Sequence, residues 1–247
     1  MVRSLWTAAT GMIAQQTNID NIANNLANVN TTGYKTEVNE FKSLLYQNLQ
    51  RKTTTADGRP KPTGAQVGLG VRNASITALY GKQGPLLSSE KDTNFAIDGK
   101  GFFAVRGGDG NTYYTRNGNF DWALGENNSN MLTTSDGLPV LDTQGRPISL
   151  GSEYVLSRVS VTADGSICYP DERNVPQPMG IQIGLTQFSN PAGLERLDDS
   201  LYAESAASGQ PINEFTSTNV VKSKVLQNYL EGSNVQVVDE MVNMIVA

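Results

Sequence analysis

The residues of this chain that could do chemistry are few, and the first is an adjacent carboxylate pair, Asp198 and Asp199. Two carboxylates held close together can share acid and base roles, as in glycoside hydrolases. Neighbouring carboxylates in a turn are far more often solvated charges than a catalytic pair. A carboxylate-only hydrolase stays open as one alternative, and it would need two facing Asp or Glu side chains about 5–10 Å apart in a cleft.

Other catalytic chemistry lacks its usual residues. The chain has no histidine and one cysteine, Cys168, so the common metal and acid–base sites are not expected and no intramolecular disulfide can form. The stretch Gly99-Lys100-Gly101 matches neither GxxxxGK[ST] nor GxGxxG. We therefore expect no catalytic residues, no cofactor and no metal, and a protein that is not an enzyme.

Composition narrows the class of partner. The 247 residues carry a net charge of −5 with 38% apolar and 17% charged side chains, and without a basic excess a nucleic-acid partner has little support. No apolar run approaches the roughly 18 residues of a membrane helix, so we expect no membrane insertion. The stretch after Arg3 is interrupted at Thr7, Thr10 and Gly11 and has no clear cleavage site, so we expect export without a cleaved signal peptide.

The first 29 residues show a helical period. Apolar side chains recur every seven residues, with a second set in the interleaved positions that has one polar break at Gln15. This pattern predicts a helix that ends between Asn30 and Gly33. The first set is Leu5, Met12, Ile19 and Leu26, and the second is Ala8, Gln15, Ile22 and Val29.

A second stripe on this helix consists of amides. The stripe comprises Asn18, Asn21, Asn25 and Asn28, and only Arg3 and Asp20 are charged among the first 34 residues. Asparagine is a mediocre helix former, and its amide both donates and accepts hydrogen bonds. The pattern alone leaves two interpretations open: a bundle helix with a wet face, or a helix surrounded by protein whose amides bond to neighbouring chains.

The last fifteen residues predict a second helix. Ser233 and Gln236 have the spacing of a capping box, and Asp239 and Glu240 follow where the helix dipole favours negative charge. The last turn is apolar and has no Gly, Lys or Arg to close it, so we expect either burial in an assembly or a sequence that stops short of the natural helix end. The apolar stripe consists of Val235, Val238, Met241, Val242 and Ile245.

The middle of the chain predicts antiparallel strands. Turn dipeptides recur at Asp98-Gly99, Asp109-Gly110, Asn117-Gly118, Asp136-Gly137 and Asp164-Gly165, with short β-rich runs between them. The Gly-, Pro- and Thr-rich stretch before this region, residues 51–70, predicts an extended or disordered connector.

The expected fold class is α+β: a mainly-β central domain flanked by long terminal helices that pair in a coiled-coil-like assembly domain. The expected domains are an N-terminal helix over 1–33, an extended connector over 34–76, a β-rich domain over 77–215, and a C-terminal connector and truncated helix over 216–247. Burying one helical seam cannot offset the ordering of some 25 residues at about 1–2 kcal/mol each. We therefore expect the terminal helices to be weakly formed in the free chain and to fold on assembly.

Several motifs together resemble the bacterial flagellar rod and hook family, and most closely its distal rod members. The resemblance rests on ANNLANVNTTGYK (residues 23–35), GKGFFAV (99–105), YTRNGNF (114–120), FSNPAGLERLDDSLYAESAASG (188–209) and YLEGSNVQVVDEMVNMI (229–245). It covers nearly the whole chain. Family members continue the last helix through a Gln-Arg-Ala-Tyr-Glu-like stretch that this sequence does not contain.

The resemblance implies a structural subunit of the flagellar basal body that self-assembles into a hollow, stiff rod and transmits torque to the hook. It implies as partners further copies in a helical homopolymer, other rod proteins, the hook protein, the surrounding P and L rings, and the flagellar type III export apparatus. A paralogous proximal rod protein and an exported β-domain adhesin or binding protein remain as alternatives.

The resemblance also assigns two sets of residues. Terminal helices that line a tube imply an assembly interface of Leu5, Met12, Ile19, Ile22, Asn25, Leu26, Asn28, Val29, Val235, Val238, Met241, Val242 and Ile245. Residues 46–71 resemble the insertion that marks the distal rod protein, which is implied to pack between subunits and stiffen the rod. This rod-specific segment includes Arg51, Asp57, Pro60, Pro62, Gly64 and Gly70.

Overall fold

The computed structural model describes residues 2–50, 64–125, 128–171, 173, 175–198, 200–217 and 220–247. The chain divides into two compact units. The terminal unit contains residues 1–27, 37–78 and 236–247, and the central unit contains residues 28–36 and 79–235. The predicted class is confirmed at the level of two helices, one near each end of the sequence, and a mainly-β region between them.

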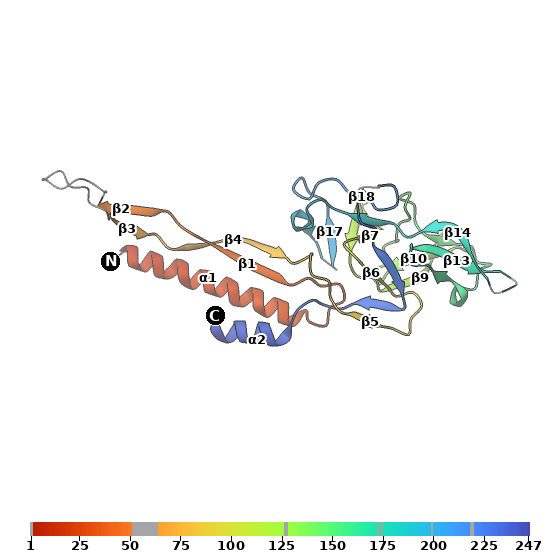
Figure 1. Cartoon of the computed structure of the whole chain (residues 1–247), viewed down its shortest axis with the longest axis horizontal. Coiled ribbons are helices and arrows are strands. Elements are labelled where there is room, and N and C mark those ends of the chain that lie inside the picture. Colours follow the sequence, from red (N-terminus) through yellow and green to blue (C-terminus); the bar gives the residue numbers. More distant parts are fainter. Residues whose placement is uncertain are drawn as a thin grey trace. The chain divides into compact units, whose positions relative to one another are not determined.

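The terminal unit combines two helices with a β-ribbon. Helix α1 contacts β1, β4 and α2 of the same unit, which are drawn together in Figure 1. Strand β1 pairs antiparallel with β4, with a register shift between Glu40 and Phe41, and β2 pairs antiparallel with β3. The elements are α1 (Val2–Ala27), β1 (Glu37–Ser43), β2 (Tyr46–Gln50), β3 (Ala65–Gly68), β4 (Val71–Ala78) and α2 (Val237–Val246).

The ribbon refines the expected connector over 34–76. Residues 37–50 and 65–78 are extended, as expected, but they also pair into a ribbon that the composition did not indicate. Ladder bonds join residues far apart in sequence, so no local pattern reveals them. Residues 51–63 lie outside the described residues.

Both helix boundaries differ from the prediction. Helix α1 ends at Ala27 rather than between Asn30 and Gly33. Helix α2 begins at Val237 after Gln236, which makes no side-chain capping bond, so the predicted capping box is wrong. The reason is that residues 232–236 are not helical, and the Ser233 hydroxyl oxygen instead accepts a hydrogen bond from the backbone N–H of Val235 at 3.3 Å.

The central unit is built from short antiparallel strands around a six-stranded sheet of order β16-β17-β8-β7-β15-β18. The strands are β5 (Leu86–Ser88), β6 (Phe95–Asp98), β7 (Phe102–Arg106), β8 (Thr112–Thr115), β9 (Phe120–Leu124), β10 (Asn130–Thr134), β11 (Ser149–Leu150), β12 (Ser160–Val161), β13 (Ser166–Pro170), β14 (Pro176–Gln182), β15 (Leu185–Gln187), β16 (Glu195–Arg196), β17 (Leu201–Ala203), β18 (Ile212–Asn213), β19 (Lys224–Gln227) and β20 (Tyr229–Glu231), with short 3-10 turns at Leu156–Arg158 and Pro191–Gly193.

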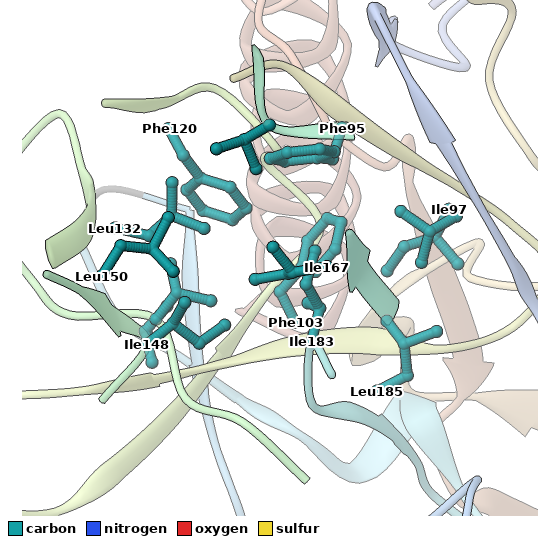
Figure 2. Packing of buried hydrophobic residues seen from close by; sticks show 14 residues of the cluster. Phe95, Ile97, Phe103, Phe120, Leu132, Ile148, Leu150, Ile167, Ile183 and Leu185 are labelled. Carbon is teal, nitrogen blue, oxygen red and sulfur yellow. The ribbon is translucent and has the colours of Figure 1, made fainter. Parts of the chain in front are cut away.

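Strand β7 lies between two hydrophobic clusters because successive side chains of a strand point to opposite faces. Phe103 and Val105 belong to the larger cluster, part of which is drawn in Figure 2. Phe102 and Ala104 belong to the smaller cluster on the other face. The run FFAV, which reads as a uniformly apolar strand, therefore helps to bind the central unit on both sides of its sheet.

The turn predictions are borne out at Asp109-Gly110, which joins β7 to β8, and at Asp164-Gly165, which joins β12 to β13. The Asn117-Gly118 stretch differs. A Cβ at Gly118 would lie 1.6 Å from the carbonyl oxygen of Phe95, and the Gly118 carbonyl accepts the backbone N–H of Phe95 at 3.0 Å. This glycine therefore permits a close backbone approach rather than a tight turn.

The β-structure also continues past the predicted boundary at 215. Strand β19 pairs with β6 and strand β20 pairs with β5. Residues 216–235, which were expected to form a connector, thus belong to the central unit.

Candidate assembly interface

The first half of α1 exposes large apolar side chains. Leu5, Trp6, Met12 and Ile13 are each exposed by 64–70%. Soluble proteins rarely leave a contiguous apolar surface of this kind uncovered unless it binds a partner. The same stretch carries a single charged residue, Arg3.

The second half of α1 packs inside the terminal unit. Ala14, Asn21, Ile22 and Asn25 are buried, whereas Ile19 remains 40% exposed. Two members of the predicted interface, Ile22 and Asn25, are therefore covered by the chain's own residues.

Helix α2 turns a carboxylate inward and its apolar side chains outward. Glu240 is buried, whereas the members of the predicted stripe that lie in α2 are exposed. The physical reason is a polar contact with α1: the Asn25 amide lies 3.4 Å from a Glu240 carboxylate oxygen, within hydrogen-bond distance. The exposed residues of the stripe are Val238, Met241, Val242 and Ile245.

The side-chain amide of Asn25 has a structural role, because it binds the backbone at the start of β1. Its Nδ2 donates to the carbonyl oxygen of Glu37 at 2.9 Å, and its Oδ1 accepts the backbone N–H of Glu37 at 2.9 Å. One amide thus satisfies both backbone groups at the start of β1, as a neighbouring strand would do. These hydrogen bonds of the Asn25 side chain join parts of one chain, in addition to any hydrogen bonds that assembly supplies.

A polar groove of about 350 Å³ lies within the terminal unit, between α1, α2 and β1. Burial raises the pKa of Glu240 on its wall, because desolvation outweighs the hydrogen bond from Asn25. The buried Asn21 Oδ1 and the side-chain oxygen and nitrogen of Asn39 make no hydrogen bond. The groove is lined by Gln15, Asn18, Asn21, Ile22, Asn25, Glu37, Val38, Asn39, Glu240, Asn243, Val246 and Ala247.

The central unit contains a buried ionic network around Glu231. One carboxylate oxygen accepts Lys35 Nζ at 2.6 Å and the backbone N–H of Gly84 at 3.0 Å, and the other accepts Arg116 Nε at 2.8 Å. Burial alone would raise the pKa of Glu231, but the positive charges of Arg116 and Lys35 hold it below its ordinary value. Arg116 also donates to the carbonyl oxygens of Gly99 and Gly101.

Asn234 fixes the same part of the central unit. Its Oδ1 accepts both the backbone N–H and the hydroxyl of Thr36 at 2.7 Å. Its Nδ2 donates to the carbonyl oxygens of Leu79 at 3.2 Å and Lys82 at 3.0 Å. Three segments far apart in sequence, 35–36, 79–84 and 231–234, are thereby joined by buried polar groups.

The other predicted interface residues fall into two groups. Leu26, Asn28 and Val29 are half-buried, whereas Val235 is buried in the central unit. Of the rod-specific segment, Gly64 and Gly70 are described, and Gly70 lies against Thr10 of α1 with a φ of +112°. Arg51, Asp57, Pro60 and Pro62 lie outside the described residues.

The described residues contain no group of three His, Cys, Asp or Glu side chains arranged to hold a metal ion. Asp198 is exposed and Asp199 lies outside the described residues, so the carboxylate pair is not seen as a pair. Cys168 is a buried strand residue. No described helix is both long and apolar enough to span a membrane.

Comparison with known proteins identifies three family segments. Residues 5–35 match the model of flagella basal body rod proteins, residues 96–169 match the D1 domain of the flagellar hook protein FlgE/F/G, and residues 226–247 match the C-terminal part of flagellar basal body rod FlgEFG proteins.

Whole-chain relatives agree with these segments. The flagellar basal-body rod protein FlgG of Borreliella burgdorferi is 40% identical over 100% of this chain and 90% of its own length. FlgG of Bacillus subtilis is 34% identical, with the same coverage. The chain belongs to the flagellar basal-body rod protein family. The predicted resemblance, and with it a structural protein of the flagellar basal body, is confirmed.

A flagellar protein with a different name is a more distant relative. The flagellar hook-basal body complex protein FlhP of Bacillus subtilis is 29% identical over 99% of this chain and 90% of its own length.

Each matched segment supplies one charged residue to the buried network: Lys35, Arg116 and Glu231 come from the first, second and third segment. Sequence reasoning did not select these residues. The sequence could have indicated them, because each is a charged residue inside a motif that carried the resemblance to rod proteins. Glu240 was also missed as a buried group, because Asp239 and Glu240 were interpreted only as negative charges that the helix dipole favours.

Proposed function

We propose that this rod-family chain is a structural subunit of the distal rod, which self-assembles into a hollow, stiff shaft and transmits torque to the hook. The observation that carries the proposal is the set of exposed apolar side chains on α1 and α2 in a chain of this family. An isolated chain leaves these side chains in water, and burying them between subunits would stabilise a polymer.

In this proposal the terminal helices form the assembly domain and pair in a coiled-coil-like arrangement around the channel. The contact between α1 and α2 and the near absence of charge on α1 support this. The exposed residues Leu5, Met12, Ile19, Val238, Met241, Val242 and Ile245 would meet neighbouring subunits directly. Ile22, Asn25 and Leu26 would support the interface from within the terminal unit. Asn28, Val29 and Val235, which belong to the central unit, remain part of the proposed interface.

The position along the rod rests on the segment 46–71. Strands β2 and β3 pair at its two ends, which supports a built hairpin-like insertion rather than a simple linker. Its packing between neighbouring subunits would stiffen the rod. A paralogous proximal rod protein is the second candidate, since a flagellar protein with a different name, FlhP, is also similar over 99% of this chain.

The partners in this proposal are further copies in a helical homopolymer, other rod proteins and the hook protein. The P and L rings around the rod and the flagellar type III export apparatus complete the set. The role requires no catalysis, cofactor, nucleic acid or membrane insertion, and the subunit would be exported without a cleaved signal peptide.

Electron microscopy of the concentrated protein tests the proposal. Straight, hollow tubes of uniform width are the expected result. A protein that stays monomeric at high concentration, also when its last helix is extended by the Gln-Arg-Ala-Tyr-Glu-like stretch of the family, would instead favour the adhesin or binding-protein alternative.

A further inference from the structure

The polar groove of the terminal unit has acceptors that the chain itself does not satisfy. Asn21 is 93% buried by its own chain, with 7% of its surface exposed, and its Oδ1 accepts no hydrogen bond. Glu240 is buried beside it, and Glu37 adds a second carboxylate. The described residues that line this groove include no Lys or Arg. A buried carboxylate and buried amide oxygens of this kind are stabilised by a cationic donor.

The rim of the groove adds a second requirement. Val38 and Val246 line it and are exposed by 40% and 80%. A well-matched occupant therefore combines a cation with apolar side chains beside it.

Helices α1 and α2 together contain one basic side chain, Arg3. Leu5 and Trp6 follow it within one turn, and both are largely exposed. The other described cations of the terminal unit, Lys42 and Arg72, face each other across the β1–β4 ribbon. Among the described cations of the terminal unit, Arg3 is thus the one followed by two largely exposed apolar side chains.

The Arg3 of the same chain cannot fill the groove. Arg3 and Asn21 are separated along one helix, and at about 1.5 Å per residue this places them about 27 Å apart. A guanidinium cannot span that distance, so a matching Arg3 must come from another molecule.

We propose that the groove between α1, α2 and β1 receives the first turn of α1 from a second copy of this chain, with the Arg3 guanidinium on Glu240 and Asn21 and with Leu5 and Trp6 against the apolar rim. The inference rests on the proposed self-assembly and names one of its contacts. Donor and acceptor surfaces lie at different ends of one helix. In a head-to-tail arrangement this contact propagates into an open helical filament when the rotation between copies does not close into a ring.

A double-mutant cycle on the concentration needed for polymerisation tests the contact. Arg3→Met removes the cation and keeps an apolar stem, and Glu240→Gln removes the charge and keeps an acceptor for Asn25. Each single change should raise the critical concentration at least about tenfold, since losing one partner of a buried charge pair costs more than the pair's net contribution. The critical concentration of the double variant should be no higher than that of the single variant that polymerises less readily.

Arg72→Met is the matched control, because it removes an exposed cation of the same unit and should leave the critical concentration unchanged. Additive effects of Arg3→Met and Glu240→Gln, or an equal effect of Arg72→Met, would overturn the contact while the proposed function stands. If the unaltered chain forms no polymer, the proposed function fails, and this contact fails with it.

The pH dependence of the critical concentration is a second test, because a purely structural role of Glu240 would not change it. In the free chain burial raises the pKa of Glu240, with Asp239 adding to the effect, and a bound guanidinium would lower it again. Polymerisation then releases protons, so the critical concentration should rise as the pH falls through the range in which Glu240 titrates. Glu240→Gln should remove that part of the dependence and leave whatever Glu37 and Asp239 contribute. An identical pH profile in the variant contradicts the proposal, and so does an inorganic cation that restores the Arg3→Met variant.

Discussion

At the scale of single residues, polar side chains organise both units of this rod-family protein. Asn25 satisfies two backbone groups of Glu37, and Glu231 accepts hydrogen bonds from Lys35, Arg116 and Gly84. Buried polar groups are costly unless every partner is present. The two sites therefore give sharp single-residue tests.

The Asn25→Ala variant should loosen the start of β1. It leaves one N–H and one C=O of Glu37 without their partners, and each lost bond to a buried group costs about 1–3 kcal/mol. We expect faster amide exchange over Glu37–Ser43, measured by mass spectrometry. Gln16→Ala, at an exposed position of the same helix, is the control, and equal exchange in both variants would contradict the role of Asn25.

The Glu231→Gln variant should destabilise the central unit by about 3–5 kcal/mol at neutral pH, because Lys35 and Arg116 stay buried without their counter-charge. The pKa of Glu231 is lowered from its ordinary 4.5, so the ionised carboxylate contributes its stability above that value and loses it as the pH falls through the lowered folded value. The difference in unfolding free energy from the unaltered protein, measured by denaturant titration, should therefore shrink in acid. Glu195→Gln, on an exposed strand, should show little difference at either pH.

At the scale of elements, the sequence predicted the type of each element better than it predicted which elements pair or pack together. The helical period located α1, and the turn dipeptides located most of the β-region. Strand pairing could not be predicted from the sequence, because β19 pairs with β6 and β20 pairs with β5 across more than a hundred residues. The capping box failed because Ser233 is buried outside the helix, and the stripe on α2 could not reveal that Glu240 rather than Met241 packs inward.

The same distinction decides which substitution tests polymerisation. Ile22 lies in the predicted seam but is buried within its own chain, so Ile22→Asp would disrupt the terminal unit itself. Met12 is 68% exposed, and Met12→Asp should leave the fold intact. We expect Met12→Asp to block tube formation in electron micrographs, because a charge would have to be desolvated at every subunit contact. Thr112→Asp, at the exposed first position of β8 in the central unit, should still assemble unless it is itself a contact.

At the scale of the whole molecule, apolar burial is unevenly distributed between the two units. Among the described residues, the buried hydrophobic side chains of the terminal unit are Ala14 and Ile22, whereas the central unit contains the two large clusters. Since apolar burial is the main stabilising term, the terminal unit should be much the less stable of the two.

Hydrogen exchange across the molecule tests this difference. In dilute solution the amides of α1 and α2 should exchange far faster than those of β7 and β8, because local opening of the terminal unit exposes little apolar surface. Exchange in the helices should slow on polymerisation while exchange in β7 and β8 stays the same. Helices that are as well protected in the free chain as the central sheet would show that their packing is complete before assembly.

The terminal unit is also discontinuous along the chain, since residues 1–27 and 37–78 are completed by 236–247. Its first and last segments must close a loop of more than two hundred residues, whereas most contacts of the central unit form within one continuous stretch. The order of events follows from this topology. The central unit can close once residue 235 is available, and the terminal unit must wait for residues 236–247. The part that is finished last is thus the part that presents the exposed apolar helices.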